Sequence, residues 1–228
     1  MADLAALEAL KEECLRCTRC PLAQTRTRVV FGDGNPQAPL VIVGEGPGEQ
    51  EDLTGVPFVG RAGKLLDRVL LENALTRRWI YVCNTVKCRA CEVNGTHKRN
   101  RAPLPAELQA CRPWLDQQLA LVRPAVILCL GVPAANSLIH KEFRITQERG
   151  RWFTETPYAP WVMASWHPAY ILRQAGDTYA RCRAELVADI DQCRKKVIEL
   201  RQHGDLLARQ APQPPVPAPE SNPGLGLF

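Results

Sequence analysis

Short apolar runs alternate with segments of helical period along this chain. Residues 40–43 are an uninterrupted apolar run, as expected for a strand that is buried on both faces of a parallel sheet. We expect further strands at residues 79–83, 125–130 and 161–165. Apolar residues recur at helical spacing over residues 3–13, 62–75, 104–122, 133–140 and 177–202. Strands that alternate with helices predict an α/β fold, a three-layer α/β/α sandwich around a central four-stranded parallel sheet.

Polar residues follow three of the predicted strands. The first strand runs into Gly44-Glu45-Gly46-Pro47-Gly48, the second ends at Asn84, and His167 follows the fourth. The carboxyl ends of parallel strands share one edge of a sheet, so we expect these side chains to converge there. Three glycines permit sharp turns and close approach of a ligand, which makes Glu45 a candidate active carboxylate.

The glycine-rich turn does not match a phosphate-binding loop. The acidic residues Glu49, Glu51 and Asp52 follow it, and their charge would repel a phosphate group. An amide at Asn84 can donate and accept hydrogen bonds at once, which suits the edge of a flat heterocycle, and Phe58 could supply a stacking face. The pattern therefore predicts a pocket for a base.

Each of these residues also has a purely structural interpretation. Phe58 could belong to the core, Asn84 could cap a turn, and His167 could satisfy a buried backbone group. Taken singly those interpretations are the better ones. The ordered set of strand-end positions favours the pocket.

Composition and charge narrow the function classes further. The chain has 228 residues and a net charge of +5, with no apolar run long enough for a membrane span and no signal-peptide pattern. We therefore expect a cytoplasmic protein, and the basic loops are compatible with a nucleic-acid partner.

Ten cysteines in such a chain favour metal ligation over disulfides. Cys17 and Cys20 form a CxxC pair, and two cysteines from distant segments would complete a four-sulfur shell. Cys14 and Cys91 compete with Cys88 and Cys111 for that assignment, and the set could bind zinc instead of iron. We expect the remaining late cysteines to be plain thiols, namely Cys129, Cys182 and Cys193.

At this point the chain resembles a known family. The motifs that carry the resemblance are Cys17-Thr-Arg-Cys20-Pro-Leu, Val30-Phe-Gly-Asp-Gly-Asn-Pro36, Gly44-Glu-Gly-Pro-Gly48, Gly55-Val-Pro-Phe-Val-Gly-Arg-Ala-Gly63, Asn84-Thr-Val-Lys-Cys88 and His167-Pro-Ala-Tyr-Ile-Leu-Arg173. In this order they look like the family 4 uracil-DNA glycosylases, the iron-sulfur type of bacteria and archaea. The similarity runs from about residue 14 to about residue 200.

The resemblance implies a uracil-DNA glycosylase fold and a monofunctional enzyme that flips uracil out of DNA, hydrolyses its N-glycosidic bond and leaves an abasic site. It also implies roles for residues. The proposed 4Fe-4S ligands, with zinc as the alternative metal, are Cys17, Cys20, Cys88 and Cys111. In the pocket, Phe58 would stack on uracil, Asn84 would read its edge, and His167 would hydrogen-bond the carbonyl oxygen that gains charge. Glu45, Gly46 and Pro47 would line the pocket near the sugar.

Two assignments remain open within that resemblance. Asp52 is a second carboxylate, and the sequence does not rank it against Glu45 as the group that activates water. The expected phosphate contacts are Arg61, Lys87, Arg89 and Arg173.

The chain departs from the family pattern at residues 89–101, which form a longer and basic insertion that we interpret as a DNA-facing loop. A related subgroup carries a histidine in such an insertion that traps the sugar covalently. His97 therefore raises an alternative, a uracil-DNA binding protein without turnover. A third class is a zinc-dependent nucleic-acid-binding protein without catalysis.

The C-terminal segment is the second departure. We expect one domain over residues 1–205, followed by a disordered, proline-rich tail over 206–228. The tail ends in apolar Leu225, Leu227 and Phe228, which resemble the short peptide that docks bacterial DNA enzymes on the replication sliding clamp. We expect a monomer at the bacterial nucleoid.

Overall fold

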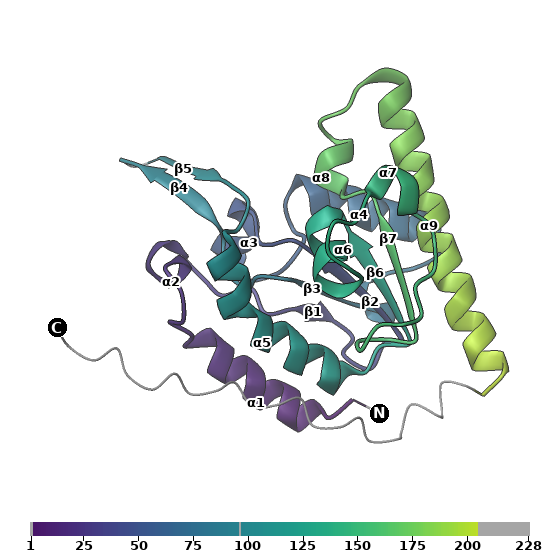
Figure 1. Ribbon diagram of the computed structural model, residues 1–228, viewed down its shortest axis with the longest axis horizontal. Helices are drawn as coiled ribbons and strands as arrows, with labels where there is room; N and C mark the ends of the chain where they lie inside the picture. Colours follow the sequence, from purple (N-terminus) through teal and green to yellow (C-terminus); the bar gives the residue numbers. More distant parts are fainter. Residues whose placement is uncertain (1, 96, 205–228) are drawn as a thin grey trace.

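The computed structural model describes residues 2–95 and 97–204. Within them a five-stranded sheet forms the centre, in the order β1-β3-β2-β6-β7 (Figure 1). Its strands are β1 (Asp33–Gly34), β2 (Leu40–Gly44), β3 (Ile80–Asn84), β6 (Val126–Leu130) and β7 (Trp161–Ser165). The four longer strands are mutually parallel, as predicted, and the two-residue β1 adds an antiparallel edge beside β3.

Helices cover both faces of this sheet, which confirms the three-layer prediction. Val41 and Val43 of β2 face a core cluster shared with α1 (Leu4–Leu15), α5 (Pro105–Val122) and α6 (Val132–Leu138). Leu40 and Ile42 face the opposite cluster, shared with α4 (Arg61–Glu72) and α9 (Gly176–Gln202). Successive strand residues point to opposite faces, so a strand that is apolar at every position is buried on both.

Several short elements were not predicted. They are α2 (Leu22–Thr25), α3 (Glu49–Thr54), the 3-10 helix η1 (Arg77–Trp79), α7 (Ile145–Glu148) and α8 (Pro168–Ile171). Each spans only three to six residues, too few for a helical period to show in the sequence. Two of them, α3 and α8, directly follow the candidate residues Glu45 and His167.

The insertion at residues 89–101 is a hairpin and not a loop. β4 (Cys91–Asn94) and β5 (His97–Asn100) pair antiparallel in a separate two-stranded sheet that projects from the body of the molecule (Figure 1). Gly95 takes φ +59° at its turn. Asn94-Gly95 is a common hairpin-turn sequence, so the signal was present and the prediction of a loop was wrong.

The predicted tail, with Leu225, Leu227 and Phe228, lies outside the described residues. Among the described helices, none is both long and apolar enough to cross a membrane.

Candidate active site

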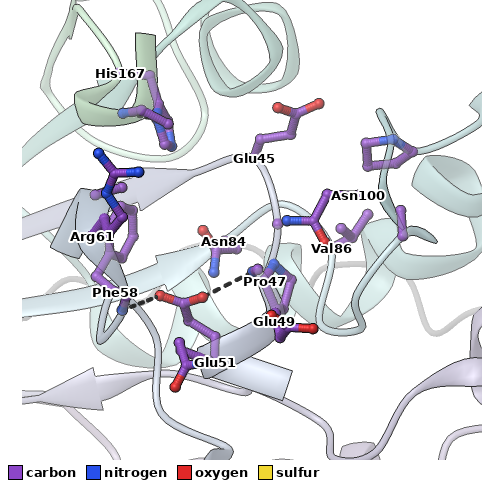
Figure 2. A pocket seen from close by; sticks show the side chains of 18 of the residues that line it. Glu45, Pro47, Glu49, Glu51, Phe58, Arg61, Asn84, Val86, Asn100 and His167 are labelled. Carbon is purple, nitrogen blue, oxygen red and sulfur yellow. Dashed lines mark hydrogen bonds between the residues drawn. The ribbon is translucent and has the colours of Figure 1, made fainter. Parts of the chain in front are cut away.

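The candidate residues at the strand ends surround one cavity of about 400 Å³ (Figure 2). Gly44 of β2 pairs with Asn84 of β3, so Glu45 leaves its strand next to Asn84. His167 follows β7 and Phe58 belongs to the segment before α4. These four lining residues confirm that the predicted strand ends meet at a single pocket.

Two glycines let Phe58 enter this cavity. A Cβ atom on Gly44 would lie 2.5 Å from Asn84 Oδ1 and 2.6 Å from Phe58 Cζ, so only glycine leaves room for both side chains. A Cβ atom on Gly63 would lie 1.8 Å from the carbonyl oxygen of Phe58, where α4 packs on the backbone. Phe58 itself takes φ +55°, an unfavourable left-handed conformation for an aromatic residue. Arg77 fixes that turn by donating to the carbonyl oxygens of Pro57, at 2.7 Å, and Phe58.

Asn84 presents its amide to the cavity. The residue is only 2% exposed, and its side chain has no hydrogen bond to another group in the described part of the chain. Buried amides are normally paired, because an unpaired one costs about 1–3 kcal/mol. This amide is therefore available to a ligand that brings its own donor and acceptor.

His167 is held as a neutral hydrogen-bond donor. Its Nδ1 accepts from the backbone N–H of Ala169 at 3.0 Å, so in the neutral ring the proton is on Nε2. Burial lowers the pKa of His167 to about 4, and the charge of Arg173 lowers it further. The imidazole ring lies beside Phe58, with 6.1 Å between the ring centroids and 28° between the planes.

Of the two candidate carboxylates, only Glu45 lines the cavity. Burial raises the pKa of Glu45, and the nearby Arg173 guanidinium opposes that rise. Asp52 is 1% exposed and accepts hydrogen bonds from the backbone N–H groups of Thr27, at 2.8 Å, and Arg28, at 3.4 Å. Asp52 therefore holds a neighbouring segment in place, and a role in activating water does not fit this position.

Glu51 is a functional residue that sequence reasoning missed. Its carboxylate accepts hydrogen bonds from the backbone N–H groups of Gly48 at 3.1 Å and Gly60 at 2.8 Å (Figure 2). It also accepts from the backbone N–H of Val59 at 2.9 Å. These donors belong to the turn after β2 and to the segment that carries Phe58. Glu51 is the third residue of α3, where an acidic side chain commonly reaches back to the cap, and that spacing could have revealed it.

The four predicted metal ligands line a second cavity. Cys17 and Cys20 come from the segment after α1, Cys88 follows β3, and Cys111 lies on α5. Cys14 also lines this cavity, whereas Cys91 does not. The other thiols, Cys129, Cys182 and Cys193, are buried in the two core clusters, as expected.

N–H donors surround these sulfur atoms. Trp114 Nε1 donates to Cys17 Sγ at 3.2 Å, the backbone N–H of Lys87 to Cys111 Sγ at 3.2 Å, and Arg26 to Cys88 Sγ at 3.3 Å. Such donors stabilise metal-bound thiolates, so the donor set fits an iron-sulfur cluster.

Thiolate shells also accept zinc, so the chemistry of the four thiols fits either group. A zinc ion draws four sulfurs to about 2.3 Å from one point, whereas a cluster spreads its ligands over several metal atoms.

Comparison with known proteins decides the family. A family model described as the uracil DNA glycosylase superfamily matches residues 31–191, more than half of the chain. The chain belongs to this superfamily. It is 41% identical over 179 residues to the type-4 uracil-DNA glycosylase of Thermotoga maritima. The match covers 77% of this chain and 88% of that protein. It is 39% identical over 173 residues to the type-4 uracil-DNA glycosylase of Archaeoglobus fulgidus, with 73% and 83% covered.

The structure divides the expected DNA contacts of this uracil-DNA glycosylase superfamily member into two groups. Arg61 and Arg173 are exposed, and Arg61 lines the cavity. Lys87 is 1% exposed and donates from Nζ to the carbonyl oxygen of Asn84 at 2.9 Å and to Gln118 Oε1 at 2.5 Å. Lys87 cannot reach a phosphate group without leaving the core, so the prediction that it contacts DNA is corrected.

Arg89 has a structural role as well. It is 5% exposed and donates from Nε to Asn100 Oδ1 at 2.7 Å and from a terminal nitrogen to the carbonyl oxygen of Lys98 at 3.2 Å. These bonds hold the base of the hairpin. A direct contact of Arg89 with phosphate therefore does not fit either.

His97 lies on the hairpin, in β5, where it pairs with Asn94. Its side chain is exposed, and it is not among the described residues that line the catalytic cavity. An imidazole in this position does not face the sugar of a nucleotide bound at Asn84. The geometry thus gives no support to covalent capture by His97.

Proposed function

We propose that this protein excises uracil from DNA as a type-4 uracil-DNA glycosylase. The observation that carries the proposal is the cavity in which an unpaired amide, Asn84, lies with an aromatic ring, Phe58, and a neutral donor, His167. The relatives' names and the family membership agree with it. Uracil must leave the duplex to enter such a cavity, so the nucleotide is flipped at a cost of a few kcal/mol.

The recognition of uracil follows from hydrogen-bonding capacity. The Asn84 oxygen accepts from N3–H of uracil and its amino group donates to O4, while Phe58 stacks on the ring. Cytosine has an amino group in place of O4 and no proton on N3, so both bonds fail when the Asn84 amide is fixed in the orientation that pairs uracil. A site built to pair a polar edge rejects the wrong partner strongly, because its own buried groups are left unpaired.

Bond cleavage places opposite charges at the two ends of the cavity. As the bond between C1′ and N1 breaks, its electron pair moves to uracil and the sugar becomes cationic. His167 donates from Nε2 to the uracil oxygen that gains charge. Glu45 stabilises the cationic sugar or orients the water that attacks C1′, and it can accept the proton of that water. An abasic site and free uracil result.

The cysteine cavity adjoins the segment that follows Asn84, because Lys87 and Cys88 line it. We propose that Cys17, Cys20, Cys88 and Cys111 hold a 4Fe-4S cluster. The cluster when bound ties distant segments together and supplies no step of base excision. Cys88 follows Asn84 by four residues, so ligation of Cys88 would hold in place the segment that presents the amide.

A uracil-release assay tests the proposal. The purified protein is incubated with a labelled oligonucleotide that contains one uracil, and each sample is divided between alkali and no treatment before a denaturing gel. We expect alkali-dependent cleavage at the uracil, and none with Asn84→Ala. A band that stays shifted after denaturation, without cleavage, would instead establish covalent capture, and the absence of both products would refute the proposal.

We further propose a partner for the segment beyond the described residues. The apolar residues Leu225, Leu227 and Phe228 at the end of a proline-rich tether suit a hydrophobic groove of the sliding clamp. Deleting residues 224–228 should abolish a pull-down with the clamp and leave uracil release from short duplexes intact. An unchanged pull-down would end this part of the proposal. One chain supplies every residue named for the site, so we propose that the protein acts as a monomer. Its DNA substrate would place it at the nucleoid.

A further inference from the structure

The β4–β5 hairpin forms one wall of the catalytic cavity and extends beyond it. Asn100 and Arg101, at the end of β5, line the cavity together with Ala90 before β4. The described residues in between, 92–95 and 97–99, project away from the body (Figure 1). At about 3.4 Å per residue, the strands carry their outer ends, Asn94 and His97, roughly 10–14 Å from that wall.

Hydrogen bonds fix the base of the hairpin to the site. Buried Arg89 links Asn100 Oδ1, at 2.7 Å, to the carbonyl oxygen of Lys98, at 3.2 Å, and also lies 3.4 Å from Glu49 Oε1 of α3. Lys98 Nζ donates to the carbonyl oxygen of Thr25 in α2 at 2.7 Å. The hairpin is therefore held in a defined direction relative to the cavity.

The outer part of the hairpin is exposed and carries more positive than negative charge. Glu92 lies opposite Arg99, Val93 opposite Lys98, and Asn94 opposite His97. All of these residues are exposed, Val93 to 51%. No ion pair of Arg99 is formed with another described residue, which leaves its guanidinium free for an anionic partner.

The cavity has two cationic groups on its other side as well. Arg61 lies across the cavity from Asn100 (Figure 2), and the exposed Arg173 follows the neutral His167 along the chain. DNA that delivers a nucleotide to Asn84 must pass between these two walls. A two-stranded ribbon has dimensions that a DNA groove admits, and lysine and arginine neutralise phosphates.

We propose that residues 92–95 and 97–99 form a DNA arm, which holds the strand flanking the flipped nucleotide on the side opposite Arg173. The arm rests on the proposed uracil excision and adds a contact that a short substrate cannot reach. Its contribution is to affinity for long DNA and not to the chemistry at the flipped base.

The test compares Arg99→Ala with a matched control, Arg78→Ala, and leaves Lys98 unaltered because it anchors the hairpin to α2. The control removes the same charge from an exposed position just before the amino end of β3, away from the cavity. For each protein, kcat/KM is measured on a 30-base-pair duplex with one G·U pair over a range of salt, and on a five-nucleotide single strand. Melting temperatures verify that both variants are folded.

With the arm variant we expect kcat/KM on the duplex to fall several-fold and the slope of log kcat/KM against log salt to flatten by about 1. The five-nucleotide substrate and the control variant should behave as the unaltered protein. Equal values for the arm and control variants would overturn the proposal, as would an equal loss on both substrates. If the unaltered protein releases no uracil from either substrate, the proposed uracil excision is refuted, and the proposal of a DNA arm is refuted with it.

Discussion

Replacing Glu51 by alanine should weaken both the fold and the pocket. The carboxylate accepts three backbone hydrogen bonds, at 3.1, 2.9 and 2.8 Å, from Gly48, Val59 and Gly60. Hydrogen bonds to charged groups contribute about 1.5–3 kcal/mol each, and water can reach part of this region. We therefore expect the free energy of unfolding to fall by about 3 kcal/mol in total. In a protein of this size that lowers the melting temperature by roughly 6–12 °C.

Thermal unfolding and kinetics together check this estimate. Because Val59 and Gly60 follow Phe58, we also expect KM for a uracil oligonucleotide to rise more than kcat falls. Glu51→Gln keeps one side-chain oxygen as an acceptor but loses the other oxygen and the charge. We therefore expect its melting temperature to lie between those of Glu51→Ala and the unaltered protein. Glu49→Ala is the control on the same helix, where a side chain that is 59% exposed contributes at most about 1 kcal/mol. If Glu51→Ala melts within about 1 °C of Glu49→Ala, the assigned role of Glu51 is wrong.

Four further outcomes follow from the site. His167→Ala should lower kcat about 100-fold, and kcat of the unaltered enzyme should show no titration near pH 6.5, because the pKa of His167 is about 4. Arg173→Gln should raise the pKa of Glu45 further, so activity measured as pH falls should be lost at a higher pH. Cys88→Ser should lower the iron content and the visible absorbance, which a purely packed thiol would leave unchanged. Lys87→Met should lower the melting temperature and leave the salt dependence of kcat/KM unchanged, since Lys87 is buried.

The parts of the fold that could be predicted are those with a long apolar signal. The runs at residues 40–43 and 125–130 became β2 and β6 because a strand buried on both faces has no polar position to obscure it. The convergence of Glu45, Asn84 and His167 followed from parallel topology alone. Neither inference needed side-chain detail.

The parts that could not be predicted depend on packing between distant segments. Lys87 and Arg89 look like surface cations in a basic stretch, but hydrogen bonds to Asn84, Gln118 and Asn100 hold them inside. Asp52 looked like a rival to Glu45 until its backbone partners were known. A sequence gives residue types, whereas burial and hydrogen-bond partners decide whether a charge is available.

The catalytic cavity is also where local rules of stability are broken. Phe58 has a positive φ, the Asn84 amide is buried without a partner, and the Glu45 carboxylate has a pKa raised by burial. Each costs stability in the free protein. Under the proposed function, the Asn84 amide gains its partner when a flat polar base fills the cavity and the Glu45 carboxylate is stabilised by the sugar cation, while the strained turn at Phe58 positions the ring that stacks on the base. A buried polar group without a hydrogen-bond partner therefore gives stronger evidence for function than a charged group on the surface, which is already hydrated.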